Sequence, residues 1–224
     1  MEGLSDLEEY LRTARILDVS APPGSGAHAS FRVTLEGGVS TLAKPAHTAP
    51  EVGMVQREVA GWVVARELGW GELVATTVLR TTDVFPGHDD QVETSLQVLW
   101  PGFQWLPDVG TLPEEDVWKA AIFDVLVHQS DRGANNWGGV LCMGVLRLKL
   151  IDHGYAFSEG RGFGSTFEEA KRGQELPDEL SDQVEAFLEG AETGPLSDFL
   201  ETAALTKLVE RGRHIVQEGT LSLS

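Results

Sequence analysis

Three oxygen-bearing side chains lie in two short segments whose spacing fits metal-ion chemistry. Asp131 and Asn136 stand in a predicted loop, residues 129–136, and Asp152 stands in the turn after the next pair of predicted strands. If those strands bring the loop and the turn together, two carboxylates and one amide offer the hard oxygen ligands that Mg²⁺ takes beside nucleotide phosphates. The alternative is two unrelated turns in which Asp and Asn serve the backbone. The presence of both segments at this spacing favours the metal site.

Lys44 ends an apolar predicted strand and is followed by Pro45. An ammonium group in this place can bind phosphate as a compact charge, or it can protect an edge strand against aggregation. Glu58 is a candidate counter-ion, because it lies at the margin of the apolar stripe of a predicted helix. Arg66 projects onto the same arc and can pair with Glu58 equally well. The sequence leaves both pairings open.

A glycine-rich turn, residues 23–30, separates two predicted strands and contains Gly24, Ser25 and Gly26. Backbone N–H groups in such a turn can approach phosphate oxygens without obstruction from side chains. An ordinary hairpin is the alternative interpretation. The turn is not the dinucleotide-binding fingerprint, because it opens no helix and Ala29 stands where the third glycine would be.

Other catalytic chemistries find little support. The six histidines show no zinc-ligand spacing, and no nucleophile elbow is present. Cys142 is the single cysteine, so a disulfide framework within the chain and a zinc site with paired thiolates are excluded. Hydrolase triads and metalloprotease sites are therefore weak candidates.

Charge restricts the partners. The 224 residues include 35 acidic and 17 basic side chains, which gives a net charge of -18 and a pI near 4.6. Nucleic acid and anionic membranes are therefore disfavoured as partners. The acidic start of the chain lacks the pattern of a signal peptide, and no apolar run reaches the length of a membrane helix. These features predict a cytoplasmic protein.

The elements that position these residues follow from periodicity and turn signals. The first part of the chain is mostly β, and it ends at Pro101 and Gly102, where neither helix nor strand continues easily. The second part is mostly helical around the loop 129–136. The pattern predicts an α+β fold with lobes at residues 1–101 and 102–224. Predicted strands are 15–20, 30–35, 39–43, 74–81, 92–100, 140–143 and 145–151, and predicted helices are 5–13, 50–68, 113–128, 177–188 and 196–217.

The order of these features resembles protein-kinase-like folds. In detail the chain is similar to the phosphatidylinositol 3- and 4-kinase branch, and most similar to the type II phosphatidylinositol 4-kinases and their bacterial relatives. The resemblance covers residues 24–157, and the DHG turn also resembles the secretory-pathway casein-kinase family. The motifs are AKP at 43–45, REVA at 57–60, DRGANNW at 131–137 and IDHG at 151–154.

The resemblance implies one compact two-lobed kinase-like domain that uses ATP with Mg²⁺ or Mn²⁺. Arg132 would buttress its loop or meet phosphate. The roles implied for the others are phosphate cover by Gly24, Ser25 and Gly26, phosphate contact by Lys44, orientation of Lys44 by Glu58, adenine contact by Leu99 and Trp100, metal binding by Asn136 and Asp152, and acceptance of the hydroxyl proton by Asp131.

Two departures from the family bear on the acceptor. His153 stands where an aromatic or amide residue is usual, and the cysteine-rich lipidation segment of type II lipid kinases is missing. We therefore expect a kinase that phosphorylates a hydroxyl group of a soluble acceptor, a protein Ser or Thr ahead of a small molecule. The alternatives are a phosphatidylinositol 4-kinase-like lipid kinase, a nucleotide-binding pseudokinase without turnover, and an enzyme that transfers an adenylyl group.

Overall fold

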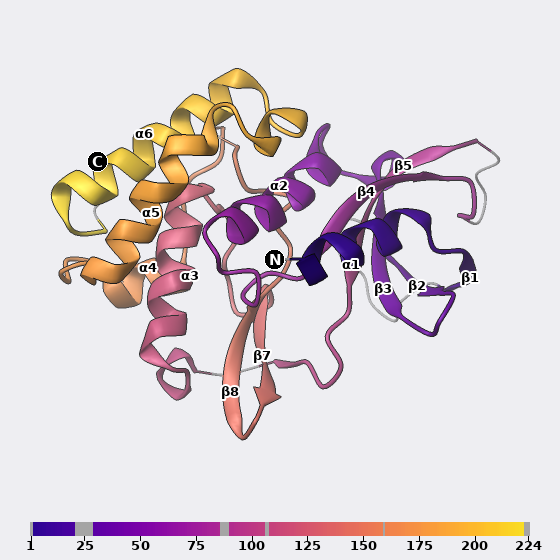
Figure 1. Ribbon diagram of the computed structural model, residues 1–224, viewed down its shortest axis with the longest axis horizontal. Coiled ribbons are helices and arrows are strands. Elements are labelled where there is room, and N and C mark those ends of the chain that lie inside the picture. The colour runs from indigo at the N-terminus through magenta and orange to yellow at the C-terminus, as the bar shows by residue number, and fades with distance from the viewer. Residues whose placement is uncertain (1, 21–28, 86–89, 106–107, 159, 222–224) are drawn as a thin grey trace.

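The computed structural model describes residues 2–20, 29–85, 90–105, 108–158 and 160–221. Within these residues the chain is α+β, with a five-stranded sheet on one side, helices on the other, and one helix between them (Figure 1). The elements up to residue 101 are α1 (Glu2–Thr13), β1 (Ile16–Ser20), β2 (Phe31–Leu35), β3 (Ser40–Pro45), α2 (Met54–Glu67), β4 (Thr77–Thr82) and β5 (Val92–Val98).

The larger sheet is antiparallel, with the strand order β1-β2-β3-β5-β4. The predicted meander of the first three strands is confirmed. The fifth strand lies between β3 and β4, so the end of β3 is a central position of the sheet rather than an edge, and Lys44 lies opposite Ser95 of β5. An edge lysine that blocks aggregation is therefore ruled out.

Helices dominate the described part of the chain after residue 101, together with a small three-stranded sheet of order β6-β7-β8. Strands β7 and β8 form a hairpin that projects from the body of the molecule, and its tip carries the fully exposed Met143 (Figure 1). The elements are β6 (Gln104–Trp105), α3 (Glu114–Leu126), β7 (Trp137–Cys142), β8 (Val145–Leu150), α4 (Thr166–Lys171), α5 (Asp178–Ala191) and α6 (Thr202–Glu218).

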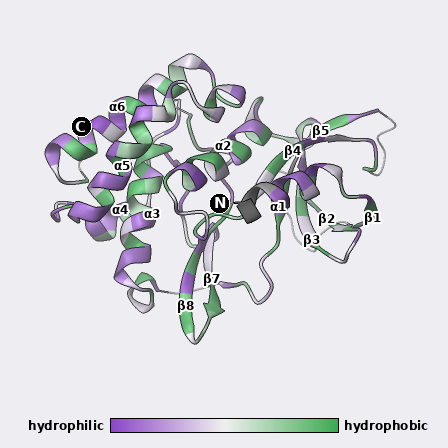
Figure 2. Ribbon diagram, viewed as in Figure 1, coloured by the Kyte–Doolittle hydropathy of each residue, from purple (hydrophilic) through white to green (hydrophobic). Residues whose placement is uncertain are grey.

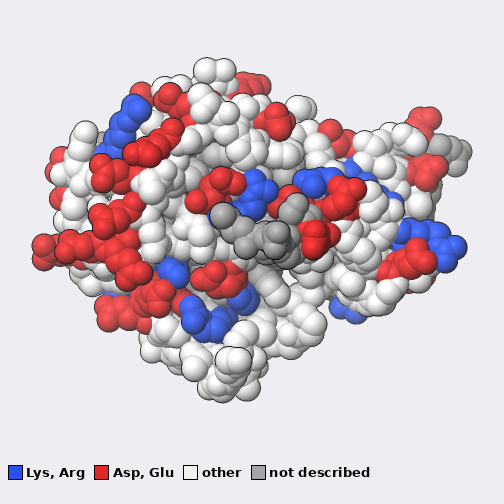
Figure 3. Space-filling model, viewed as in Figure 1, with Lys and Arg blue, Asp and Glu red and all other residues white. Residues whose placement is uncertain are grey.

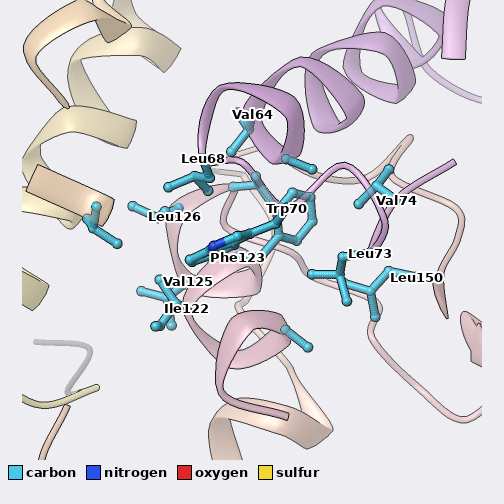
Figure 4. Close-up of a cluster of buried hydrophobic side chains, with 14 of the residues drawn as sticks. Val64, Leu68, Trp70, Leu73, Val74, Ile122, Phe123, Val125, Leu126 and Leu150 are labelled. Atoms are coloured by element: carbon cyan, nitrogen blue, oxygen red, sulfur yellow. The ribbon is translucent and has the colours of Figure 1, made fainter. Parts of the chain in front are cut away.

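Helix α2 is buried nearly all around, although the sequence predicted a single apolar stripe. Its residues from Val59 to Ala65 belong to the larger of two apolar clusters, together with side chains of α3, α5 and α6. Trp70 follows α2 and lies beside Phe123 of α3 in this cluster (Figure 4). The smaller cluster joins α1 to the sheet and contains Leu11, Val33, Leu35, Ala43, Val78, Phe85 and Leu96.

Several boundaries differ from the predicted ones for local reasons. Helix α2 begins at Met54 because Gly53 adopts a left-handed conformation with φ 83°. Helix α6 begins at Thr202, because the 3₁₀ turn Pro195–Asp198 precedes it. Strand β6 and helix α4 were not predicted, since two and six residues are too few to show a period.

The surface carries the charge excess unevenly. Acidic side chains gather over the helical side of the view in Figure 3, while the lower end, where the β7–β8 tip lies, is free of charged side chains. The same tip is coloured as hydrophobic in Figure 2. Among the described residues, no helix is long and apolar enough to cross a membrane.

Candidate active site

Lys44 is the centre of a cluster of three charged side chains that we call the open triad: Lys44, Glu58 and Asp152. Strand β3 delivers Lys44 from the sheet, α2 delivers Glu58, and Asp152 follows β8. The ammonium nitrogen Nζ of Lys44 donates to Oε1 of Glu58 and lies 2.9 Å from Oδ1 of Asp152. Residues more than one hundred positions apart in the chain therefore meet at one cation.

The second oxygen of Glu58 is also used. Oε2 accepts a hydrogen bond of 3.0 Å from the backbone N–H of His153. Glu58 thus connects the strand lysine to the turn that carries Asp152. Arg66, the competing partner considered from the sequence, pairs instead with Glu8 of α1 and with Glu67.

Asp152 is the member of the open triad that solvent reaches, because 41% of its side chain is exposed. Its backbone is left-handed, with φ 61°, and its carbonyl accepts from the side-chain amide of Gln129 at 2.9 Å. Partial burial alone would raise the pKa of Asp152, but the charge and hydrogen bond of Lys44 outweigh it and lower the pKa to about 2. The carboxylate is therefore ionised at neutral pH.

The open triad carries one positive and two negative charges. Burial would lower the pKa of Lys44, but the two carboxylates outweigh burial and raise it. The pKa of Glu58 is raised by burial and by the charge of Asp152, against the effect of Lys44. One ammonium thus serves two carboxyl groups, and the ionised one that solvent reaches is that of Asp152.

Asp131 and Asn136 lie in the loop that precedes β7, and Asn136 is the last residue before that strand. The side-chain N–H₂ of Asn136 donates to the backbone carbonyl of Asp131, which leaves its oxygen as the atom that can face a cation. The backbone carbonyl of Asn136 accepts from Ile151 at 3.1 Å, so the hairpin brings Asn136 beside the residue that precedes Asp152. Asn136 is buried and Asp131 is exposed.

Arg132 lies beneath this loop in a second cluster, which we call the sealed network: Asp124, Arg132, His153 and Ser165. The side chains of Arg132 and Asp124 have no exposed surface. Nε of Arg132 lies 3.1 and 3.2 Å from the two Asp124 oxygens, and Oγ of Ser165 donates to the same carboxylate at 2.7 Å. Of the two roles considered for Arg132, the structure supports the buttress.

The remaining donors of Arg132 join the two chemistry-bearing segments. Nη1 donates to the carbonyls of Asn136 and Ile151 at 2.6 and 2.7 Å. Nη2 lies 3.2 Å from Nδ1 of His153. Burial and the Arg132 charge hold the pKa of His153 well below its usual range, so its neutral ring accepts at Nδ1. Arg132 thereby fixes the residues on both sides of the hairpin.

The proposed nucleotide-contact residues fall in two places. Gly24, Ser25 and Gly26 lie outside the described residues. Leu99 follows β5, and its backbone N–H donates to the backbone carbonyl of Ser40 at 3.0 Å. Trp100 is half-buried and stacks on Phe103 with centroids 6.3 Å apart, and Nζ of Lys149 lies 5.3 Å from its ring centroid. Trp100 therefore does not fill the core.

The sequence matches no protein-family model and no curated protein. The fold does match solved structures. A crystal structure of the Golgi casein kinase with Mn/ADP bound has a TM-score of 0.68 and 15% identity, covering 96% of this chain and 75% of that chain. A second crystal structure of the Golgi casein kinase has a TM-score of 0.62 and 15% identity, with 96% and 74% covered.

The chain has a kinase-like fold. The match extends over almost the whole chain, so it includes the sheet that carries Lys44, the helix that carries Glu58 and the hairpin between Asn136 and Asp152. In this kinase-like fold the open triad lies where the sheet, α2 and the end of β8 meet.

Sequence reasoning missed two features of the site. Asp124 lies on the predicted helix at 113–128, but nothing in its spacing distinguishes it from a solvent-exposed carboxylate. Gly61 is the second: a Cβ there would lie 2.9 Å from Cγ of His153, so only glycine lets α2 approach the DHG turn this closely. A glycine inside an apolar helical stretch was the available signal.

Proposed function

We propose that the protein is a phosphotransferase that uses ATP and a divalent cation to phosphorylate a hydroxyl group. The observation that carries the proposal is the position of Lys44, held between Glu58 of α2 and Asp152 of the DHG turn. A buried lysine anchored in this way presents a fixed positive charge to phosphate at a place that remains open on the Asp152 side.

The residues present fit a divalent cation. Mg²⁺ and Mn²⁺ bind through one or two protein carboxylates together with phosphate and water oxygens, and they neutralise charge on the phosphates. Asp152 supplies an ionised, exposed carboxylate and Asn136 an amide oxygen. No group of three or more His, Cys, Asp or Glu side chains in the described part of the chain can hold a metal unaided. The cation would therefore come with its nucleotide, as the Mn/ADP of the Golgi casein kinase structure illustrates for that protein.

Each residue then has one task. Lys44 binds phosphate oxygens, and Glu58 holds Lys44 in place from behind. Asp131, exposed at the mouth of its loop, orients the acceptor hydroxyl and takes its proton. The hydroxyl oxygen bonds to the terminal phosphorus while the bond to the bridging oxygen breaks, and ADP leaves. In-line placement and charge neutralisation are the main requirements of this reaction.

The remaining assignments extend the same proposal. Leu99 and Trp100 would contact adenine, and Gly24, Ser25 and Gly26 would cover the phosphates. On the resemblance of the motifs, we propose that the chain is a member of the phosphatidylinositol 3-/4-kinase-like superfamily, with the lobe boundary at Pro101 and Gly102. Because the surface is strongly acidic, we propose a protein Ser or Thr acceptor rather than a lipid, with action in the cytoplasm.

The first test compares ATP turnover in the wild type and in Asp152→Ala. With labelled ATP and Mg²⁺ or Mn²⁺, we expect wild-type autophosphorylation or substrate labelling and a loss on the order of 10²- to 10³-fold in the variant. Asp182→Ala removes an exposed carboxylate of α5 and serves as the matched control. Equal turnover in Asp152→Ala and wild type would refute the assignment of Asp152.

The same assay separates the alternatives. The mass added to the product distinguishes phosphate from an adenylyl group. Label in phosphatidylinositol vesicles, in place of protein, would favour the lipid kinase. A thermal shift with ATP and Mg²⁺ but no turnover under any condition would favour a nucleotide-binding module.

A further inference from the structure

Glu8 is a buried carboxylate that lies outside the motifs and outside the open triad. It belongs to α1, and only 6% of the residue is exposed. Its Oε1 accepts from Nε1 of Trp62 at 2.9 Å and from Nη1 of Arg66 at 2.7 Å, both on α2. Its Oε2 accepts from Arg12 at 3.2 Å. A single carboxylate of α1 therefore binds two side chains of the helix that carries Glu58.

Helix α1 is itself fixed to the sheet. Leu11 is fully buried in the smaller apolar cluster. Arg80 of β4 donates through Nη1 to the carbonyls of Leu11 and Ala14 at 3.2 and 2.7 Å, where the last carbonyls of α1 lack helical partners. Because α1 is anchored to the sheet, the hydrogen bonds of Glu8 to Trp62 and Arg66 connect α2 to the sheet through α1.

The spacing along α2 connects Glu8 to the open triad. Glu58, Trp62 and Arg66 follow one another at intervals of four residues, which places them along one ridge of the helix. One end of the ridge contacts Lys44, and the other two positions contact Glu8. A rotation of α2 that carried Glu58 away from Lys44 would also pull Trp62 and Arg66 away from Glu8. That movement would take two of its three hydrogen-bond donors, Trp62 and Arg66, from the buried Glu8 carboxylate, which is unfavourable.

We propose that Glu8 is a positioning residue that sets the rotation of α2 and so holds Glu58 against Lys44. Its consequence for catalysis rests on the proposed function, whereas its consequence for Glu58 does not. Burial would raise the pKa of Glu8, but the hydrogen bonds from Trp62 and Arg66 outweigh it and lower the pKa. The carboxylate is therefore charged at neutral pH.

The backbone N–H of His153 is a direct reporter of Glu58, because it donates to Oε2 of that residue. In Glu8→Ala we expect the exchange of the His153 amide, measured by NMR, to accelerate at least about tenfold. The backbone N–H of Val127 donates to the carbonyl of Phe123 at the end of α3, and this amide should exchange at the wild-type rate. Glu9→Ala makes the same change at an exposed position of the same helix, and both amides should be unaffected.

Turnover gives the second readout. Misplacement of Glu58 should lower kcat by roughly 10- to 100-fold in Glu8→Ala, with little change in KM for ATP. If the wild type shows no turnover with any acceptor, the proposed function fails and the amide measurement still decides the role of Glu8. If turnover is present but neither amide exchange nor kcat responds to Glu8→Ala, only the positioning role fails.

Two further variants guard against an unfolded Glu8→Ala. Trp62→Phe keeps an aromatic ring at this buried position but removes the indole N–H that donates to Glu8. It should also accelerate the exchange of the His153 amide. Glu8→Gln keeps the oxygen that accepts from both Trp62 and Arg66, so it should restore most of the protection and of kcat. Equal acceleration of the His153 and Val127 amides would mean general destabilisation and would overturn the proposal. Failure of Glu8→Gln to rescue would overturn it as well.

Discussion

The open triad and the sealed network are both built from buried charges, but they differ in their relation to solvent. In the sealed network the side chains of Asp124 and Arg132 have no exposed surface. Nε, Nη1 and Nη2 of Arg132 and Oγ of Ser165 all lie within hydrogen-bond distance of acceptors in the protein. In the open triad one cation serves two carboxylates, and Asp152 remains 41% exposed. In the first arrangement the protein supplies the partners of both charges, while in the second the carboxylate of Asp152 stays open to solvent.

Two consecutive residues show how closely the clusters are joined. Asp152 belongs to the open triad and His153 to the sealed network. The left-handed backbone at Asp152 separates the directions of the two side chains. The contrast teaches that charge burial by itself does not single out a candidate site, whereas incomplete neutralisation beside an accessible carboxylate makes the open triad the stronger candidate. Substitutions in the two clusters should accordingly have different consequences.

The largest effect on stability is expected from Arg132→Ala. Removal of this guanidinium leaves the Asp124 carboxylate buried without its cation and frees the carbonyls of Asn136 and Ile151. Loss of one partner of such a pair costs about 3–5 kcal/mol of unfolding free energy. Urea denaturation followed by circular dichroism measures it.

Lys207→Ala is the control for Arg132→Ala, because Lys207 and Glu210 form an ion pair with both side chains about half exposed. Its effect should stay below about 1 kcal/mol. Similar losses of stability in the two variants would remove the distinction between a sealed and an exposed pair.

A smaller effect, on both clusters at once, is expected from Gly61→Ala. The new Cβ would lie 2.9 Å from Cγ of His153, whose ring is held by Arg132 and packs edge-on against Phe123. Overpacking of this kind costs about 1–3 kcal/mol and should also reduce turnover, because His153 and Glu58 share a hydrogen bond. Urea denaturation and the turnover assay are the measurements.

The matched change is Gly190→Ala in α5, where a Cβ would meet no neighbouring atom. There the substitution should stabilise the protein by about 0.5–1 kcal/mol through helix propensity and leave turnover unchanged. Destabilisation at Gly190 and none at Gly61 would contradict the close packing of α2 on His153.

The smallest effect concerns acid stability. Because the pKa of Asp152 is lowered to about 2 in the folded chain, from 3.8, its ionisation stabilises the fold above about pH 4 and that contribution is lost as the pH falls toward 2. In Asp152→Asn the decline of stability over this range should be shallower. Urea midpoints from pH 5 to pH 2 test this, with Asp182→Asn as the control at an exposed position. Parallel declines in wild type and Asp152→Asn would contradict the lowered pKa.

Much of the fold could be predicted, because long elements leave a period in the sequence. The five strands of the larger sheet and the helices around Glu58 and Asp124 were placed within a few residues. The position of β5 between β3 and β4 could not be predicted, since strand order depends on packing between distant segments. Burial on all sides of α2 was also missed, because a helix between two layers has no solvent-exposed face to mark its period.

The site was predictable where chemistry requires a particular residue type. The family resemblance implied that Lys44 meets Glu58 and Asp152, whereas residue type alone left the partner of Glu58 open, and the catalytic roles of the three residues stay predictions. Lys44 and Arg66 were equal candidates to pair with Glu58 until the structure placed Glu8 beside Arg66. Contacts such as Glu8 with Trp62 join residues 54 positions apart and leave no local signal.

The shared position of α2 determines how this chain can be divided. Its apolar residues belong to the larger cluster with α3, α5 and α6, although its sequence lies before Pro101 and Gly102. A cut between those two residues would separate Val63 and Val64 from the side chains of α3, α5 and α6 in this cluster and expose the matching surface on the other piece. Two such fragments should be insoluble when made separately and should reassemble when made together, so the chain is suited to fragment complementation rather than to the exchange of autonomous halves.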